Sequence, residues 1–414
     1  MHAPHAPADP RYAPDGAYAN VRLGVSLLAA TLLAAGMWSI VVVMPKVQAD
    51  FGVARATASM PYTLSMVGFA AGAMVLGRWA DRIGIVLPLC VSAALLAAGF
   101  VIAGMAPGIE VFAAAHLLIG FGAAVGFGPL IADISHWFVR RLGLAVVVVA
   151  SGNYVGGAVW PLVLNQTVPA FGWRHSYIVI GLAVAAVVLP LSLALRRRPA
   201  EHTFAAAAAA TAVAQANLGL SVRTLMTLLS IAGVACCVAM SMPQVHIVAY
   251  CSDLGYGVAR GAEMLSLMLF LGIFSRVASG YVSDRIGGAK TLLIGSVMQG
   301  VALLLYLFFD GLTSLYVVSG VFGLFQGGIV PMYAVICREL LPPREAGARI
   351  GVLVTATIVG MAFGGYFSGL IFDWTGSYGM AYLNGVLWNA VNVTIVGWLV
   401  WKQMRQGGAI AQSA

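Results

Sequence analysis

Charged side chains are scarce in this sequence. Asp, Glu, Lys and Arg make up only 9% of its 414 residues, whereas 61% of the residues are hydrophobic. Soluble domains carry roughly 25% charged residues, and a soluble globule of this size could not bury so much apolar surface. A disordered chain is also excluded, because disorder needs low hydrophobicity and high charge. The composition predicts an all-α membrane protein that crosses the bilayer many times.

Motifs for metal, nucleotide and catalytic chemistry are missing as well. The five cysteines have no metal-ligand spacing, no P-loop or Ser-His-Asp pattern occurs, and the glycine-rich stretches 120–129 and 360–369 follow no predicted strand. We interpret these stretches as close-packing helix faces. The net charge of +8 comes from dispersed basic residues rather than from one patch. The sequence predicts no metal, no cofactor, no enzymatic activity and no nucleic-acid partner.

Charged residues divide the chain into twelve long apolar runs. Eleven runs contain no charge over 19 to 32 residues, and the twelfth, between Glu263 and Asp284, contains only Arg276. A spanning helix needs about 20 apolar residues. Because the runs are continuous rather than alternating, helices are favoured over strands. We predict twelve transmembrane helices and no separate soluble domain.

The longest polar segment separates six runs from six. The predicted order is a tail, a six-helix bundle, a linker, a second six-helix bundle and a tail, with bounds 1–21, 22–195, 196–222, 223–402 and 403–414. With a cytoplasmic N-terminus, 17 of the 22 Lys and Arg residues lie on the cytoplasmic side, 4 lie on the outer side, and Arg276 lies within a run. The positive-inside rule then places both termini in the cytoplasm. The first residues lack a signal-peptide pattern, and we expect a multi-pass protein of a bacterial inner membrane.

The two halves of the chain echo each other. The segment LGRWADRIG at 76–84 follows the second run, and SGYVSDRIG at 279–287 follows the eighth. Four positions match at a constant offset of 203, pairing Gly77, Asp81, Arg82 and Gly84 with Gly280, Asp284, Arg285 and Gly287. A looser echo pairs 169–181 with 373–385. Parallel six-helix repeats of this kind are one design of membrane transporters.

The sequence resembles the major facilitator superfamily over about residues 22–402. The shared features are twelve spans, a central polar segment and the motif G-x-x-x-D-R-x-G after the second and eighth spans. The resemblance implies two pseudo-symmetric six-helix bundles and transport by alternating access. It implies that Asp81 lies near the start of the eleventh span and Asp284 near the start of the fifth, where a carboxylate favours a helix N-terminus. The matched motif residues would then act in gating. The alternative is that these charges only anchor loops at the membrane surface.

A finer resemblance is to the branch of monocarboxylate porters and oxalate–formate antiporters. It is carried by FGVARATASMPYTL (51–64), WFVRRLGLA (137–145), FGWR (171–174) and GIFSRVASGYVSDRIG (272–287). The resemblance implies that Arg276 binds the carboxylate of a substrate. Two departures stand out, since Gly272 replaces an aspartate common in monocarboxylate porters and the eleventh span, 352–372, has no second basic residue. A monoanion therefore fits better than a dianion.

Arg276 is also the most informative single residue on physical grounds. It lies eight residues before Asp284, about 12 Å along a helix. Burying an arginine in a bilayer costs at least ~2.5–3.5 kcal/mol on insertion scales, and no acidic residue occupies the middle of any run. A bound carboxylate would supply the counter-charge. The alternatives are snorkelling to the interface and hydrogen bonds to backbone carbonyls.

Other polar residues at membrane depth are candidates for substrate contact. They are Trp38, His116, Asn153, Tyr154, His246, Gln326 and Tyr333. Each could equally serve helix packing, and either histidine could carry a proton. Asp133 has His136 and Arg140 within one or two turns, which favours a local ion pair. Arg55, near the outer mouth, could steer anions, but the default expectation is a solvated interface anchor.

These observations predict a monomeric secondary transporter of small organic anions, most of all monocarboxylates, by proton symport or anion exchange. Its partners would be the substrate, protons and the lipid bilayer. A multidrug or cation exporter of the same fold is the first alternative, but it would need a buried acid. An intramembrane enzyme would need converging catalytic residues, and a sensor would need a longer soluble tail.

Overall fold

Helices account for nearly all of the structure. The computed structural model describes residues 14–138, 140–197, 220–340 and 346–413, and no strand occurs among them. The first half of the chain forms α1 (Ala17–Leu33), α2 (Ala35–Phe51), α3 (Arg55–Ile83), α4 (Val86–Gly104), α5 (Ile109–Ala123), the 3-10 turn η2 (Ala124–Gly126), α6 (Gly128–Ser135) and α7 (Leu142–Ala194). The second half forms α9 (Val222–Asp253), α10 (Gly257–Ile286), α11 (Gly288–Phe308), α12 (Leu312–Gln326), α13 (Ile329–Leu340), α14 (Ala346–Thr375) and α15 (Tyr378–Ser413).

The predicted number of spans is confirmed. Eleven described helical segments are long and apolar enough to cross a membrane. The segment Gly143–Ala194 contains Gly172, whose torsion angles are not helical (φ 76°, ψ 159°). The label α7 therefore covers two successive helices that meet at Gly172, and counting them separately gives twelve spans. The helices extend beyond the predicted bounds, because α1 begins at Ala17 rather than Arg22 and α15 continues to Ser413. Most of the predicted linker, 198–219, lies outside the described residues.

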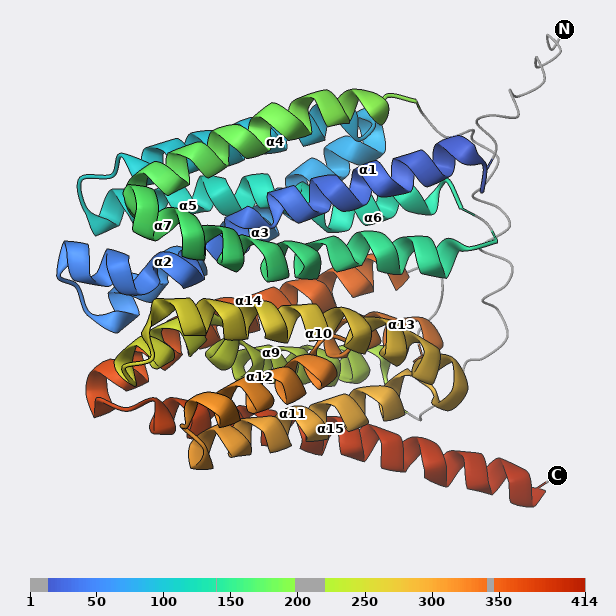
Figure 1. Ribbon diagram of the computed structural model, residues 1–414. Coiled ribbons are helices and arrows are strands. Elements are labelled where there is room, and N and C mark those ends of the chain that lie inside the picture. The colour runs from blue at the N-terminus through green and yellow to red at the C-terminus, as the bar shows by residue number, and fades with distance from the viewer. Residues whose placement is uncertain (1–13, 139, 198–219, 341–345, 414) are drawn as a thin grey trace, which may run out of the picture.

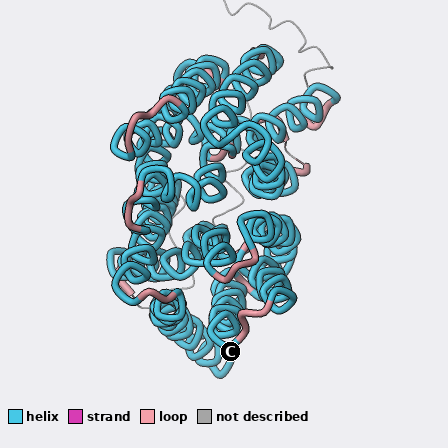
Figure 2. The backbone as a smooth tube through the Cα atoms, turned by 60° about the vertical axis from the view of Figure 1, so that its left-hand side comes forward, coloured by secondary structure: helices cyan, strands magenta, loops and turns pink. Residues whose placement is uncertain are grey.

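The spans form two bundles that lie side by side (Figures 1 and 2). One contains α1–α7 and the other α9–α15, and α1 begins and α15 ends at the same end of the molecule (Figure 1). We call this the terminal end and the opposite one the far end. The bundles meet mainly where α3 packs on α14 and where α7 packs on α10.

The repeat between the halves extends to backbone torsion angles. Gly84 and Gly287, equivalent positions of the repeated motif, end α3 and α10 with φ values of 86° and 87°. Gly172 and Gly376, from the looser echo, have φ values of 76° and 66°. Side chains rarely adopt such values, which explains glycine at these positions. The two bundles are therefore structural copies of one unit.

Glycines allow the helices to approach closely. A methyl group on Gly120 of α5 would overlap the carbonyl oxygen of Ser65 in α3, and one on Gly364 of α14 would overlap the hydroxyl of Ser241 in α9. Both glycines belong to the stretches at 120–129 and 360–369. Small residues at helix contacts are typical of membrane proteins, so the prediction of close-packing faces is confirmed.

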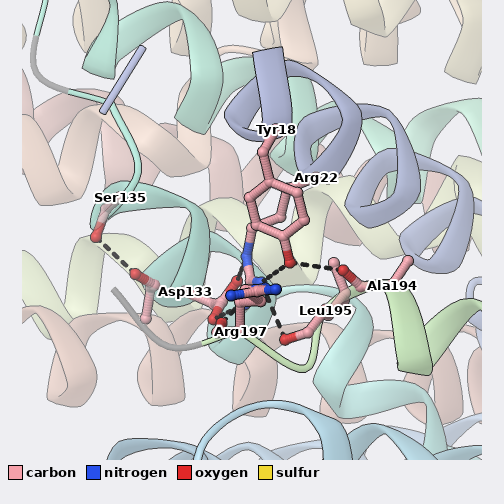
Figure 3. Close-up of polar contacts among 8 residues, drawn as sticks. Tyr18, Arg22, Asp133, Ser135, Ala194, Leu195 and Arg197 are labelled. Carbon is pink, nitrogen blue, oxygen red and sulfur yellow. Dashed lines mark hydrogen bonds and ion pairs between the residues drawn. The ribbon is translucent and has the colours of Figure 1, made fainter. Parts of the chain in front are cut away.

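A buried ion pair joins three spans at the terminal end of the first bundle (Figure 3). The Arg22 guanidinium donates to both carboxylate oxygens of Asp133, from Nε at 2.8 Å and from Nη2 at 2.6 Å. Its Nη1 donates to the carbonyl of Leu195 at 2.9 Å, and Arg22 is 1% exposed. The sequence pattern favoured a local partner for Asp133, His136 or Arg140, and folding brings the distant Arg22 to both of its oxygens.

Candidate functional site

Arg276 lies at the seam between the two bundles. Its side chain is 6% exposed, Nη1 donates to the carbonyl of Ala150 in α7 at 2.7 Å, and Nε donates to the carbonyl of Gly327 at 3.2 Å. Ala150 belongs to the first bundle, while Gly327 joins α12 to α13 in the second. No acidic side chain in the described part of the chain forms an ion pair with Arg276. Its positive charge is therefore met only by backbone dipoles and an aromatic ring.

That ring belongs to Tyr154 of α7. The Arg276 Cζ atom lies 4.3 Å from its centroid, within the range of a cation–π interaction. Any side chain at Gly272, one helical turn before Arg276, would overlap the same ring. Tyr154 thus occupies the space in which an acid at position 272 would lie.

Two further predicted residues join the first-bundle side of this seam. The indole Nε1 of Trp38 in α2 donates to the carbonyl of Asn153 at 3.2 Å. The Asn153 amide contacts the Met37 sulfur at 3.0 Å. Gly157 lies in α7, and a methyl group there would overlap both the Trp38 indole of α2 and the Leu269 side chain of α10. The structure therefore brings Trp38, Asn153 and Tyr154 to one seam with Arg276.

Gln326 approaches the seam from the second bundle. It precedes Gly327, whose carbonyl binds Arg276, and it accepts a hydrogen bond from the amide of Gln244 in α9. Tyr333 lies elsewhere, since its hydroxyl donates to Asn392 of α15 at 2.9 Å, and Asn392 donates in turn to Ser296 of α11. Tyr333 thus contributes to packing inside the second bundle.

His116 is enclosed within the first bundle. Its Nδ1 lies 2.7 Å from the Phe112 carbonyl and its Nε2 lies 3.4 Å from the Tyr177 hydroxyl. The rings of Phe112 and Tyr177 also pack against the imidazole, and Phe112 and Tyr177 both pack against Trp173. The residue is 1% exposed. This geometry suits a packed, hydrogen-bonded histidine.

His246 belongs to a polar cluster at the far end. Its Nε2 lies 2.7 Å from the Gly365 carbonyl, so this nitrogen carries a hydrogen and donates it. Its Nδ1 lies 3.0 Å from the hydroxyl of Tyr378. That hydroxyl also accepts a hydrogen bond from Nη1 of Arg55 at 2.6 Å. The chain of bonds therefore leads from the second bundle into the first.

Two carboxylates of the second bundle complete the far-end cluster, which consists of Arg55, His246, Asp253, Asp373 and Tyr378. Asp253 forms an ion pair with Arg55 at 3.0 Å. Asp373 accepts hydrogen bonds at 2.8 Å from the backbone nitrogens of Arg55 and Ala56, and so caps the N-terminus of α3. Arg55 is 5% exposed; the expectation of a solvated Arg55 is wrong, because both bundles close over it. These contacts tie the bundles together at the far end.

The repeated motif behaves differently at the terminal end. Asp81 and Asp284 are both exposed, and within the described ranges neither forms a hydrogen bond or an ion pair. Arg285 donates to Tyr281 of its own helix. A methyl group on Gly280 would meet nothing within 4 Å, and one on Gly77 would only touch Pro129. Residues 139 and 341–345, beside the two helix starts that the resemblance implies for these carboxylates, lie outside the described residues, so the predicted gating contacts stay a prediction.

Comparisons with known proteins agree with this architecture. A model of the Major Facilitator Superfamily matches residues 26–313 and 264–412. Monocarboxylate transporter 13 of Rattus norvegicus is 24% identical over 301 residues, covering 70% of this chain and 68% of that protein. The gentisate transporter of Corynebacterium glutamicum is 23% identical over 343 residues, covering 78% and 75%.

Solved structures share the fold at low identity. The nucleoside transporter NupG superposes with a TM-score of 0.73 at 14% identity, covering 92% of this chain and 99% of that one. A bacterial homolog to the human lysosomal transporter Spinster, in an inward-facing and occupied conformation, gives 0.66 at 16% identity, covering 95% and 97%. With twelve spans in two related bundles and a family match along most of its length, this chain belongs to the Major Facilitator Superfamily and is a membrane transporter, not an enzyme.

Proposed function

We propose that this protein transports small organic anions, monocarboxylates above all, by alternating access. The observation that carries the proposal is Arg276, a guanidinium buried at the seam between the bundles and held by the carbonyls of Ala150 and Gly327. One of these carbonyls comes from each bundle. A ligand bound to Arg276 would therefore contact both moving parts of the transporter.

Electrostatics favours a single negative charge on the ligand. A guanidinium in a low-dielectric seam is poorly compensated by neutral carbonyls, whereas a carboxylate can accept two parallel hydrogen bonds and cancel the charge. In the described eleventh span, Arg349–Thr375, the one basic residue is Arg349 at its start. That span therefore provides no second cation at mid-depth. One cation suits one carboxylate. The printed names of the monocarboxylate and gentisate transporters among the relatives support the same substrate class.

The contacts between the bundles support an inward-facing state. The distribution of Lys and Arg supports a cytoplasmic location for the terminal end, where α1 begins and α15 ends (Figure 1). The far-end cluster then closes the outer side, where Asp373 caps α3 and Asp253 pairs with Arg55. Opening the outer side requires the Asp373 cap and the Arg55–Asp253 pair to separate. We assign this form to a monomer in a bacterial inner membrane.

Proton coupling completes the proposal. No acidic residue lies near the middle of a described span, so the proton would neutralise the pair formed by Arg276 and a weak-acid substrate. Symport with a proton and exchange against a second anion both satisfy this charge balance. They differ in whether a pH gradient alone drives accumulation.

Transport in proteoliposomes tests the proposal. Purified protein should accumulate radiolabelled lactate or pyruvate under an imposed inward proton gradient, or by exchange against internal unlabelled acid. Arg276→Gln should lower uptake to the level of protein-free vesicles, and Arg276→Lys should recover only part of it, because an ammonium lacks the planar fork. Equal uptake by wild type and Arg276→Gln would refute the assigned role of Arg276. Indifference to both gradients would refute the coupling.

A further inference from the structure

A buried pair of amide side chains lies next to the arginine. Gln244 of α9 donates from Nε2 to Oε1 of Gln326 at the end of α12. Gln244 is 2% exposed and Gln326 is 0% exposed. The Nε2 atom of Gln326 has no hydrogen-bond partner in the described structure. A buried donor without an acceptor costs free energy. We therefore expect a ligand to supply the missing acceptor.

Another buried glutamine in the same bundle shows how a structural amide is satisfied. Gln299 of α11 is also 0% exposed. Its Nε2 donates to the Cys236 carbonyl at 3.3 Å, and its Oε1 accepts from the Cys236 thiol at 3.7 Å. Both ends of Gln299 are therefore engaged within the bundle. Gln326 differs because its carbonyl is used and its donor is not.

Gln326 is adjacent in the chain to a hydrogen-bond partner of Arg276. The next residue, Gly327, gives its carbonyl to Arg276 Nε, and consecutive Cα atoms are 3.8 Å apart. Both residues lie at the break between α12 and α13, where the helix ladder is interrupted. Gln244 reaches the same place from α9, directly after Pro243. The residue with the unpartnered donor is thus the chain neighbour of the residue whose carbonyl holds the guanidinium.

We propose that the Gln244–Gln326 pair is a second subsite of the substrate site and selects monocarboxylates that carry an additional oxygen. The carboxylate binds Arg276, and Gln326 Nε2 donates to a keto or hydroxyl oxygen of the same molecule. Gln244 orients the Gln326 amide by binding its carbonyl, so that the donor is directed toward the substrate. This assignment rests on the proposed transport of monocarboxylates and adds a preference within that class.

The preference has a physical basis. A site with a buried donor discriminates strongly against an analogue that lacks the matching acceptor, because the donor then stays unpaired in the complex. Simple aliphatic acids should therefore bind worse than 2-oxo or 2-hydroxy acids of the same length. A purely apolar site would show the opposite order, since it would favour the less hydrated aliphatic acid.

Three acids of equal chain length test the subsite. Propionate, lactate and pyruvate compete for uptake or binding on wild type, Gln326→Met, Gln326→Glu, Gln244→Met and Arg276→Gln. Wild type should bind lactate or pyruvate about 10-fold or more tightly than propionate. Gln326→Met should erase this ratio and leave propionate within about 2-fold of wild type. Gln326→Glu keeps the acceptor for Gln244, and an ionised carboxylate there would compete with the substrate for Arg276, so it should weaken binding of all three acids.

Gln299→Met is the matched control, because it removes a buried glutamine whose two ends are both satisfied. It should lower the melting temperature but keep the ratio of lactate to propionate affinity. An unchanged ratio in well-folded Gln326→Met would overturn the subsite. If Arg276→Gln at the same time loses binding of all three acids, the proposed function stands without the subsite. If wild type binds none of the three acids, both proposals fall.

Discussion

Arg276 and Tyr154 face each other across the boundary between the two bundles, with the guanidinium carbon 4.3 Å from the ring centroid. The arginine belongs to α10 and the tyrosine to α7, which are the two helices of one inter-bundle contact. The ring supplies an electron-rich face to a cation that has no acidic partner among the described residues. Tyr154 therefore fixes the orientation of the group that we assign to substrate binding.

Replacing the ring should weaken substrate binding. A desolvated cation–π contact contributes up to about 2 kcal/mol, so Tyr154→Leu should raise the KM for a monocarboxylate by roughly 10- to 30-fold. Tyr154→Phe keeps the aromatic face and should stay within about 3-fold of wild type. Initial rates of uptake into proteoliposomes measure both. Similar KM values for the leucine and phenylalanine variants would argue against the ring contact.

The Asp373 cap should control opening of the far end. Asp373→Asn removes the charge that stabilises the first two backbone N–H groups of α3, a contribution of about 1 kcal/mol. Hydrogen exchange at the start of α3 should become roughly 5-fold faster, as mass spectrometry of peptides covering residues 55–60 can measure.

Asp310→Asn is the control for that experiment. Asp310 is an exposed acid whose carboxylate binds no described residue, although its backbone carbonyl accepts from Tyr256. Its neutralisation should leave exchange in α3 unchanged. Equal exchange rates in Asp373→Asn and wild type would show that the cap does not limit opening.

The Arg22–Asp133 pair should be important for stability rather than for transport specificity. Removing one partner of a buried ion pair costs about 3–5 kcal/mol, so Arg22→Leu or Asp133→Leu alone should lower the melting temperature strongly. The double variant should be more stable than either single one, because no buried charge is left unpaired. Arg260→Ala, which breaks an exposed pair with Glu263, should leave the melting temperature unchanged. A double variant less stable than both single ones would contradict this account.

Close helix packing gives a fourth prediction. Gly120→Ala forces α5 away from the Ser65 carbonyl of α3, and overpacking of this kind costs about 1–3 kcal/mol. Gly24→Ala in α1 adds a methyl group that meets nothing within 4 Å and should be neutral or stabilising, since alanine is the better helix former. Thermal unfolding in detergent compares the two. Equal melting temperatures would show that α3 and α5 can separate without cost.

Local sequence properties determined the spans and the repeat. The length of an apolar run sets whether a helix can cross the bilayer, and this depends only on neighbours along the chain. Glycine at 84 and 287 follows from the positive φ that ends each helix. The burial of Arg276 without an acidic partner could also be inferred from its run.

Only the tertiary structure decided which polar groups meet. Arg22 binds Asp133 across 111 positions, Arg55 binds Tyr378 across 323, and Gln244 binds Gln326 across 82. Charge spacing along one helix predicted a local partner for Asp133, and the packing of α1 against α6 supplied a different one. Inside a bilayer a polar side chain takes whichever partner helix packing brings within reach, and that is set by contacts between helices rather than by residues nearby in sequence.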